Sequence, residues 1–261
     1  MEVSELRIHP IKSLRGISVQ ASQLEPRGLA HDRRMMLVDA DGRFISQREH
    51  APLALVGVQP TDKGWSVTAP GHEALGIGNV GTGKALNVTV WRDTVSAERV
   101  SDMADAWFSN VLGFPARLVR MTDESSRPLH EDFAREGDQV SFADAMPVLV
   151  ASEASLGELN SRVGRELEMR RFRANIIIRG CEPHAEDGWR EIRIGETVLR
   201  STKRCGRCIV TTIDPETGVA GTEPLKALAG YRLFDQNACF GMYYAPVQCG
   251  SVRVGDRVLA K

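Results

Sequence analysis

Residues 203–218 read Lys203-Arg204-Cys205-Gly206-Arg207-Cys208-Ile209-Val210-Thr211-Thr212-Ile213-Asp214-Pro215-Glu216-Thr217-Gly218, with two cysteines three apart among cationic side chains. Lys or Arg beside a thiol stabilises the thiolate, which is both the nucleophile and the metal ligand. The β-branched run that follows predicts a buried strand, and Asp-Pro-x-Thr-Gly predicts a tight turn. The stretch therefore indicates either an activated cysteine at the mouth of a strand or a basic loop with an incidental cysteine pair.

The composition is that of a globular chain with little net charge. Its 261 residues contain 33 basic and 34 acidic side chains, a net charge of −1, so nothing favours nucleic-acid binding. The start of the sequence lacks the pattern of a secretory signal, and no stretch approaches the about 18 apolar residues of a membrane span. Five irregularly spaced cysteines fit a reducing compartment. We therefore expect a cytoplasmic protein with no membrane contact.

Short apolar runs separated by turn residues predict β structure in the first part of the chain. The runs are Leu6 to Ile11, Ile17 to Leu24, Arg34 to Val38, Leu53 to Val58, Trp65 to Ala69 and Leu86 to Val90. Asp39-Ala40-Asp41-Gly42 predicts a hairpin turn. A helix is expected from Ser101 to Leu112, because Ser101 can cap it, apolar residues including Met103 recur at helical spacing, and Gly113 stops it.

The second part begins near Val140, after a polar stretch (122–139) that we expect to be a surface connection or lid. Ser152 predicts the start of a helix, and residues 176–178 predict a buried strand. Hairpins are expected where Ile192 and Ile194 face Val198 and where Val252 and Val254 face Val258, with a short helix from Pro224 to Ala229. Short strands with few helices predict a mainly β, α+β chain built from partly closed barrels.

Other metal and redox sites explain the cysteines poorly. A zinc site fails on spacing, because Cys239 and Cys249 are ten residues apart rather than two to four. A thioredoxin-like dithiol needs a helix after its Cys-x-x-Cys, whereas the residues after Cys208 predict a strand. The six histidines form no pair at helical metal-ligand spacing.

The cysteine segment resembles the signature of MOSC domains, which are named for the C-termini of molybdenum-cofactor sulfurases. The resemblance covers nearly the whole chain. It rests on Ile8-His9-Pro10-Ile11-Lys12-Ser13, Asp32-Arg33-Arg34, Gln47-Arg48-Glu49, Phe142-Ala143-Asp144-Ala145-Met146-Pro147, Ser152 to Leu156, Asn160, Phe172-Arg173-Ala174-Asn175, Cys205 to Gly218, Gly241 and Val254-Gly255-Asp256. It implies an N-terminal MOSC-associated β-barrel domain (1–120) followed by a MOSC β-barrel domain with added helices (121–261).

The resemblance also implies a molybdenum cofactor, a pterin dithiolene that holds the metal. Cys208 falls on the position of the protein thiolate that ligates molybdenum, and Cys205 on a neighbour that does not. The positions around the cofactor are Lys12, Ser13, Arg33, Asp144, Arg173, Asn175, Gly206 and Arg207. Arg and Lys suit the terminal phosphate of the pterin, and cations beside Cys208 favour its thiolate. Asp144 is expected to act beside the metal, although a turn-capping role also fits its type.

Within the MOSC proteins, the pattern resembles the mitochondrial amidoxime-reducing component and bacterial proteins that detoxify N-hydroxylated bases. This implies an oxidoreductase that reduces small N-hydroxylated compounds. The sequence contains no iron–sulfur cluster motif, so electrons are expected from a separate ferredoxin, cytochrome b5-like protein or flavin reductase. The alternative is a carrier of molybdenum cofactor or sulfur in which Cys208 holds a persulfide.

Overall fold

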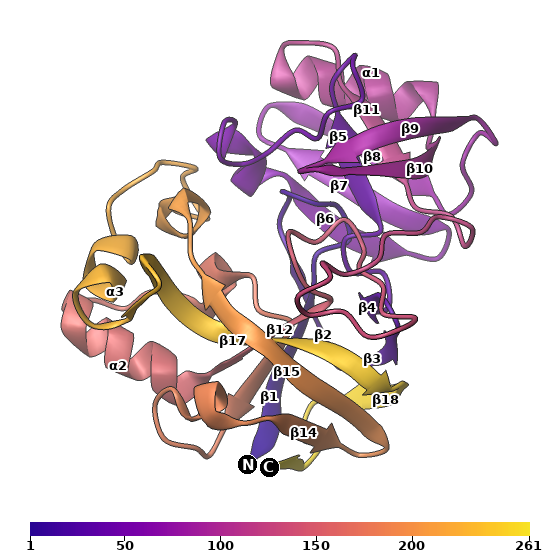
Figure 1. Cartoon of the computed structure of the whole chain (residues 1–261). Helices are drawn as coiled ribbons and strands as arrows, with labels where there is room; N and C mark the ends of the chain where they lie inside the picture. The colour runs from indigo at the N-terminus through magenta and orange to yellow at the C-terminus, as the bar shows by residue number, and fades with distance from the viewer.

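The structure is a computed structural model that describes all 261 residues. The chain forms two β-rich parts, one above the other in Figure 1. The upper part holds strands and a helix from residues 35–120, and the lower part holds the C-terminal half of the chain together with the first strands. Strands dominate and only three α-helices occur, which confirms the mainly β, α+β expectation.

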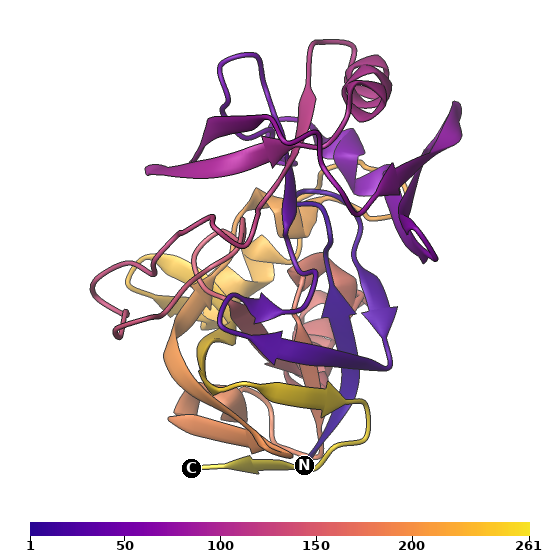
Figure 2. The ribbon, with the colours of Figure 1, turned by 90° about the vertical axis from the view of Figure 1, so that its right-hand side faces the viewer.

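The lower part is built on a nine-stranded sheet. Its order is β19 (Val258–Ala260), β14 (Glu191–Ile194), β15 (Thr197–Gly206), β17 (Asn237–Gln248), β12 (Val148–Ser152), β13 (Ile176–Arg179), β1 (Glu2–Ile8) and β2 (Ile17–Val19), with β16 (Leu233–Phe234) paired to β17. A three-stranded sheet adds β18 (Gly250–Arg253), β3 (Ala21–Glu25) and β4 (Gly28–Leu29). Strands from the two ends of the chain thus lie side by side (Figure 2), because β3 pairs with β18.

The upper part contains two smaller antiparallel sheets. One has the order β5 (Met35–Val38), β11 (Arg117–Arg120), β10 (Asp93–Arg99) and β9 (Ala85–Val90), and the other β6 (Gly57–Thr61), β7 (Gly64–Ala69) and β8 (His72–Gly78). The predicted helix is confirmed as α1 (Asp102–Leu112), capped by Ser101 and ended by Gly113 in the left-handed conformation. Its buried face holds Ala104 and Phe108, whereas Met103 is exposed.

Short helices surround the lower sheet. They are α2 (Glu153–Val163), α3 (Leu225–Tyr231) and the 3-10 turns η2 (Met169–Phe172), η3 (Ala185–Gly188) and η4 (Ile209–Thr212), while η1 (Ala51–Leu55) belongs to the upper part. Ser152 caps α2 as predicted, because its hydroxyl accepts a hydrogen bond from the Ser155 amide at 3.1 Å. None of the helices is both long and apolar enough to cross a bilayer.

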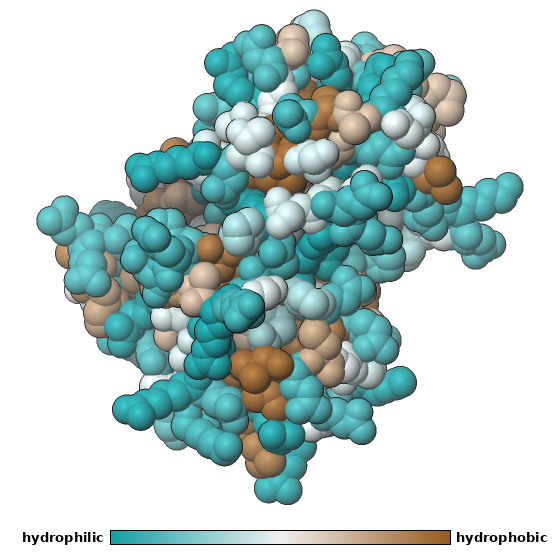
Figure 3. All heavy atoms as spheres, turned by 45° about the vertical axis from the view of Figure 1, so that its right-hand side comes forward, coloured by the Kyte–Doolittle hydropathy of each residue, from teal (hydrophilic) through white to brown (hydrophobic).

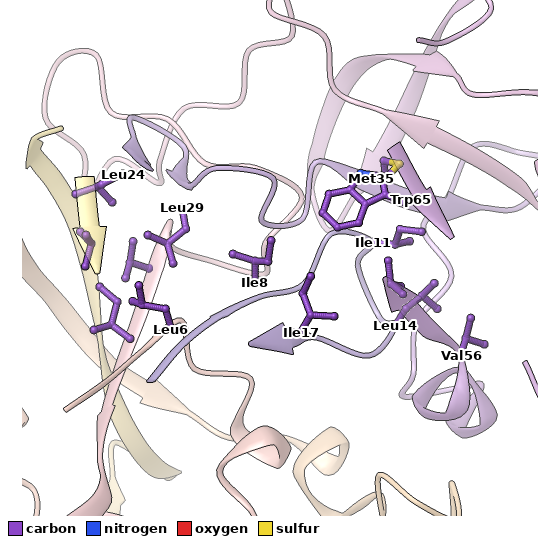
Figure 4. Close-up of a cluster of buried hydrophobic side chains, with 14 of the residues drawn as sticks. Leu6, Ile8, Ile11, Leu14, Ile17, Leu24, Leu29, Met35, Val56 and Trp65 are labelled. Carbon is purple, nitrogen blue, oxygen red and sulfur yellow. The ribbon is translucent and has the colours of Figure 1, made fainter. Parts of the chain in front are cut away.

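One hydrophobic cluster runs through both parts. Leu6, Leu24 and Leu29 pack among strands of the lower part, and Ile11 and Trp65 lie in the upper part (Figure 4). Ile8 and Ile17 lie between these groups in the same view. The two parts therefore share one core, and a site between them has walls fixed by common packing. Outside, the face shown in Figure 3 is mostly hydrophilic with small separate apolar patches.

Three expectations about local structure were wrong. The strand predicted from Leu53 to Val58 begins instead as the 3-10 helix η1 (Ala51–Leu55), and only Gly57 and Val58 belong to β6. Residues 209–212 form a 3-10 turn rather than a strand, because the Thr211 and Thr212 hydroxyls bond back to the carbonyls of Cys208 and Ile209 at 3.0 and 2.8 Å. The hairpin at the C-terminus does not form, since β18 pairs with β3 and β19 pairs with β14. In the turn between β18 and β19, the Arg253 amide donates a hydrogen bond to the Asp256 carboxylate. The two strands on either side of this turn pair with different partners.

Candidate active site

A cavity lies where the two parts of the chain meet. We call it the inner cavity. Segments from both parts line it: Lys12, Ser13, Arg33, Ser46, Gln47, Arg48, Ala143, Asp144, Met146, Leu149, Phe172, Arg173, Asn175, Arg207, Cys208, Val210 and Tyr243. Of the nine residues that the sequence singled out, eight line this cavity. The ninth, Gly206, lines a second cavity that opens beside Cys208.

Three of these residues have a strained backbone. Ser13, Arg33 and Arg173 have φ values of 70°, 51° and 56°, in the left-handed region that side chains other than glycine rarely adopt. Such strain persists only where the surrounding structure imposes it, and it clusters at ligand sites. All three lie on one cavity, which supports it as the candidate functional site.

Arg33 is held in place by a fully buried carboxylate. Its Nη1 donates to Asp32 Oδ2 at 2.6 Å, and its Nη2 donates to the Arg173 carbonyl at 3.1 Å. Burial acts to raise the pKa of Asp32, but the Arg33 charge and a bond from His9 outweigh it and hold that pKa well below its usual value. Asp32 is therefore ionised, and it fixes the Arg33 fork at the cavity wall.

Arg173 lies beside Arg33 with no carboxylate bound to it. Its Nη1 donates to the Leu14 carbonyl at 2.7 Å. Burial and the neighbouring Arg33 lower the pKa of Arg173 to about 9. Two guanidinium groups at one wall repel each other unless an anion lies between them, so this wall is suited to a phosphate.

Elsewhere on the cavity wall, Asp144 joins three groups. It accepts hydrogen bonds from Lys12 Nζ, from Arg48 Nη2 at 2.9 Å and from the Trp91 indole at 3.3 Å. Desolvation acts to raise the pKa of Asp144, but Lys12 and Arg48 outweigh it and hold that pKa far below its usual value. Burial, partly opposed by Asp144, lowers the pKa of Lys12 to about 8. Asp144 thus organises two cations beside Cys208.

Cys208 caps η4 and is half-buried in the cavity wall. It is the one cysteine of the inner cavity, so a metal bound there would receive a single protein sulfur. Buried Cys205 instead faces Arg207, whose Nη1 lies 2.7 Å from its sulfur. The Arg207 Nη2 donates to the Phe172 carbonyl at 2.6 Å, and its buried Nε has no partner.

Of the cations expected beside Cys208, Arg207 lines the same cavity, but Lys203 and Arg204 have other partners. Lys203 lies over the Phe133 ring at 4.7 Å, and Arg204 pairs with Asp187 at 2.8 Å. Burial acts to lower the pKa of Arg48, but attraction and hydrogen bonding to Asp144 and Cys208 raise it. Arg48, distant in sequence, is therefore a cation that faces the thiol. Lys203 and Arg204 lie on β15, before the strand ends at Gly206, and their charged groups are engaged by Phe133 and Asp187.

The remaining predicted residues shape the wall. The Asn175 side chain accepts from the Leu149 amide at 3.1 Å and donates to the Arg7 carbonyl at 3.2 Å. The Ser13 hydroxyl donates to the Ile45 carbonyl at 3.2 Å. Both side chains use their hydrogen bonds on backbone groups, so they fix the positions of the segments that line the cavity.

Sequence reasoning missed Arg48 and Tyr243 as cavity residues. Arg48 belongs to one of the segments that carry the family resemblance, Gln47-Arg48-Glu49, but no role in the site was predicted for it. Tyr243 gave no signal, because an aromatic residue in a long strand is ordinary core material; its neighbour Tyr244 is fully buried.

The inner cavity has a surplus of positive charge. Five cationic side chains line it, Lys12, Arg33, Arg48, Arg173 and Arg207, against the single lining carboxylate of Asp144. The Asp32 carboxylate, which lies behind the cavity wall, pairs with Arg33 and offsets one more positive charge. Uncompensated buried charge is costly, so this excess of positive charge favours an anionic ligand in the cavity.

The molecule thus consists of two β-rich parts with a shared core, and one thiol and five cations line the cavity between them. The chain belongs to the MOSC-domain family: the MOSC N-terminal beta barrel domain matches residues 1–115, and the MOSC domain matches residues 137–259.

Relatives along nearly the full chain support this assignment. The chain is 35% identical to "Mitochondrial amidoxime reducing component 2" of Bos taurus over 98% of this chain and 82% of that protein. It is 36% identical to "Mitochondrial amidoxime-reducing component 1" of Mus musculus over 98% of this chain and 81% of that protein. The chain is 34% identical to "Mitochondrial amidoxime-reducing component 1" of Danio rerio over 98% of this chain and 83% of that protein.

Proposed function

We propose that the chain binds a molybdenum cofactor in the inner cavity and reduces N-hydroxylated compounds with electrons from a separate protein. The observation that carries the proposal is the meeting of one thiol, Cys208, with five cations in a single cavity. The names of the relatives, amidoxime-reducing components, support the same reaction class. When bound, molybdenum would supply two-electron cleavage of an N–O bond, which releases the reduced nitrogen compound and water.

The residues of the chain have separate tasks in this proposal. The Cys208 sulfur would be the protein ligand of the metal, and the Arg48 guanidinium lies beside it. Arg33 and Arg173 hold the terminal phosphate of the pterin from one wall. The unpartnered Nε of buried Arg207 fits a further acceptor of the ligand.

Proton supply falls to Lys12 in the same scheme. The reaction consumes two protons, and Lys12 Nζ is a buried ammonium whose pKa of about 8 keeps it protonated but weakly held at neutral pH. Asp144 stays ionised and serves as its positioning partner, together with Arg48.

Gly206 leaves room where the strand passes the second cavity, since a Cβ there would meet Asn237 at 3.2 Å.

The test separates metal binding from turnover. The full chain is purified from a host that makes molybdenum cofactor, and molybdenum and pterin are measured per mole of protein. Conversion of an aryl amidoxime to the amidine is then followed with a chemical electron donor, so that no partner protein is needed. We expect bound molybdenum, pterin and turnover, and a loss of at least about a hundredfold in Cys208→Ser.

Cys249→Ser is the matched control, because Cys249 is exposed and lines neither cavity; it should behave as the parent chain. Zinc in place of molybdenum, or full activity in Cys208→Ser, contradicts the proposal. Cyanide-labile sulfur on Cys208 without molybdenum would instead identify a sulfur carrier.

A further inference from the structure

The second cavity opens directly beside Cys208. We call it the outer cavity. It shares Arg48, Asp144, Arg207, Cys208 and Tyr243 with the inner cavity. A ligand held in the inner cavity at Cys208 would therefore be reached from the outer one.

Aromatic rings from three distant segments wall the outer cavity. Each has a cation over its ring: Arg48 lies 4.7 Å from the Trp91 centroid, Lys203 lies 4.7 Å from that of Phe133, and Arg204 lies 4.3 Å from that of Phe234. Aromatic rings that line a cavity offer stacking surface to a planar guest.

Trp91 lines this cavity with a backbone conformation and a degree of exposure that are unusual for tryptophan. It occupies the turn between β9 and β10 with a φ of 58°, which is strained for a bulky side chain. Its side chain is 45% exposed, although so large an apolar group is normally covered. The indole donates to Asp144 at 3.3 Å and packs on Phe44. Strain and exposure together at a site indicate a function.

The outer cavity is also positively charged. Arg48, Lys203, Arg204 and Arg207 line it, against Asp144 and Asp235, and Asp187 behind the wall offsets part of the Arg204 charge. Of these cations, Lys203 and Arg204 belong to the outer cavity alone. A cationic guest is therefore repelled more strongly than a neutral one of the same shape.

We propose that the outer cavity is the substrate vestibule, in which Trp91 is a specificity-determining residue that stacks on planar substrates. The cations that line this cavity admit neutral substrates and repel protonated products. This inference rests on the proposed function. An N-hydroxyamidine is a weak base, because the electronegative oxygen withdraws electrons from nitrogen, and it is neutral near pH 7. Two electrons and two protons break the N–O bond to give water and an amidine, which takes a third proton and becomes a cation. One surface thus discriminates between substrate and product by charge.

The test measures binding without turnover. Two isosteric probes that lack an N–O bond, neutral 2-naphthamide and cationic 2-naphthamidinium, are titrated by calorimetry into the full chain purified with its cofactor. We expect naphthamide to bind about five- to tenfold more tightly, the effect of roughly one unit charge at about 8 Å in a partly solvated site. Lys203→Gln should reduce that ratio to about twofold.

Trp91→Leu keeps an apolar side chain but removes the aromatic face. It should weaken both probes by about three- to tenfold, as expected for one aromatic pair. Arg92→Gln is the matched control, because Arg92 lies on the same turn and lines neither cavity; it should leave both affinities unchanged. Equal or tighter binding of naphthamidinium, or unchanged affinities in Trp91→Leu, overturns the inference.

A parallel turnover assay with 2-naphthamidoxime distinguishes the two proposals. Turnover without discrimination between the probes refutes the vestibule and leaves the proposed function standing. Discrimination without turnover supports the vestibule as a binding site and contradicts the proposed reaction.

Discussion

Replacing Arg173 with Ala should empty the cavity of its ligand while leaving the fold almost intact. A charge-assisted hydrogen bond to a phosphate contributes about 1.5–3 kcal/mol, so the ligand should bind about tenfold to a hundredfold more weakly. The cost to the free protein is small for a structural reason. Arg173 loses one hydrogen bond to the Leu14 carbonyl, about 1 kcal/mol, but its repulsion from Arg33, which helps to lower its pKa to about 9, is relieved.

The assay compares pterin released per mole of folded protein with the melting temperature of the ligand-free chain. Arg173→Ala should lose most of its pterin and melt within a few degrees of the parent, whereas Arg173→Lys should recover only part of the pterin, since an ammonium lacks the bidentate fork. Arg165→Ala, at an exposed position, is the control. A full complement of pterin in Arg173→Ala would refute the placement of the phosphate at this wall.

Three further results are expected. Cys205→Ser should keep its molybdenum and lose no more than about threefold in turnover, because Cys205 faces Arg207 rather than the inner cavity; parallel loss with Cys208→Ser would contradict the assignment of a single ligand. Anion affinity should fall as pH rises through about 8, where Lys12 loses its proton. Between pH 8 and about 10.5 the unfolded chain binds more protons at Lys12 than the folded chain, so this group makes the free energy of unfolding rise with pH; Lys12→Met should abolish both effects in calorimetry and urea titrations. Asp32→Asn should cost about 3–5 kcal/mol in urea unfolding, because it leaves buried Arg33 without its carboxylate; a cost below 1 kcal/mol would show that the pair does not position Arg33.

The sequence predicted the site better than it predicted the strand pairing. Arg33, Arg173 and Cys208 stand in motifs whose order along the chain could be matched to a family, so their meeting at one cavity could be expected. The roles of Arg48 and Trp91 could not be derived in this way. They contact Asp144 across 96 and 53 residues of chain, and no local pattern encodes such a contact.

The wrong expectations have the same origin. The run after Cys208 has strand propensity, but the threonine hydroxyls close a 3-10 turn instead. Val252 alternates as a strand should, yet nothing local states that its partner is Ser22 near the other end of the chain. Propensity predicts that a strand exists, and tertiary packing decides with which strand it pairs.

The placement of the cavity between the two parts has an energetic consequence. Lys12 and Arg33 enter the cavity from the N-terminal side, and Arg173, Arg207 and Cys208 come from the C-terminal side. The thiol comes from the C-terminal side alone, whereas the five cations are divided between the two sides. The shared core keeps the two sets together in the absence of ligand, at the expense of backbone strain at Arg33 and Arg173 and of repulsion between their charges. A bound anion removes that repulsion and bridges the two sides, so its binding free energy adds directly to the stability of the folded chain.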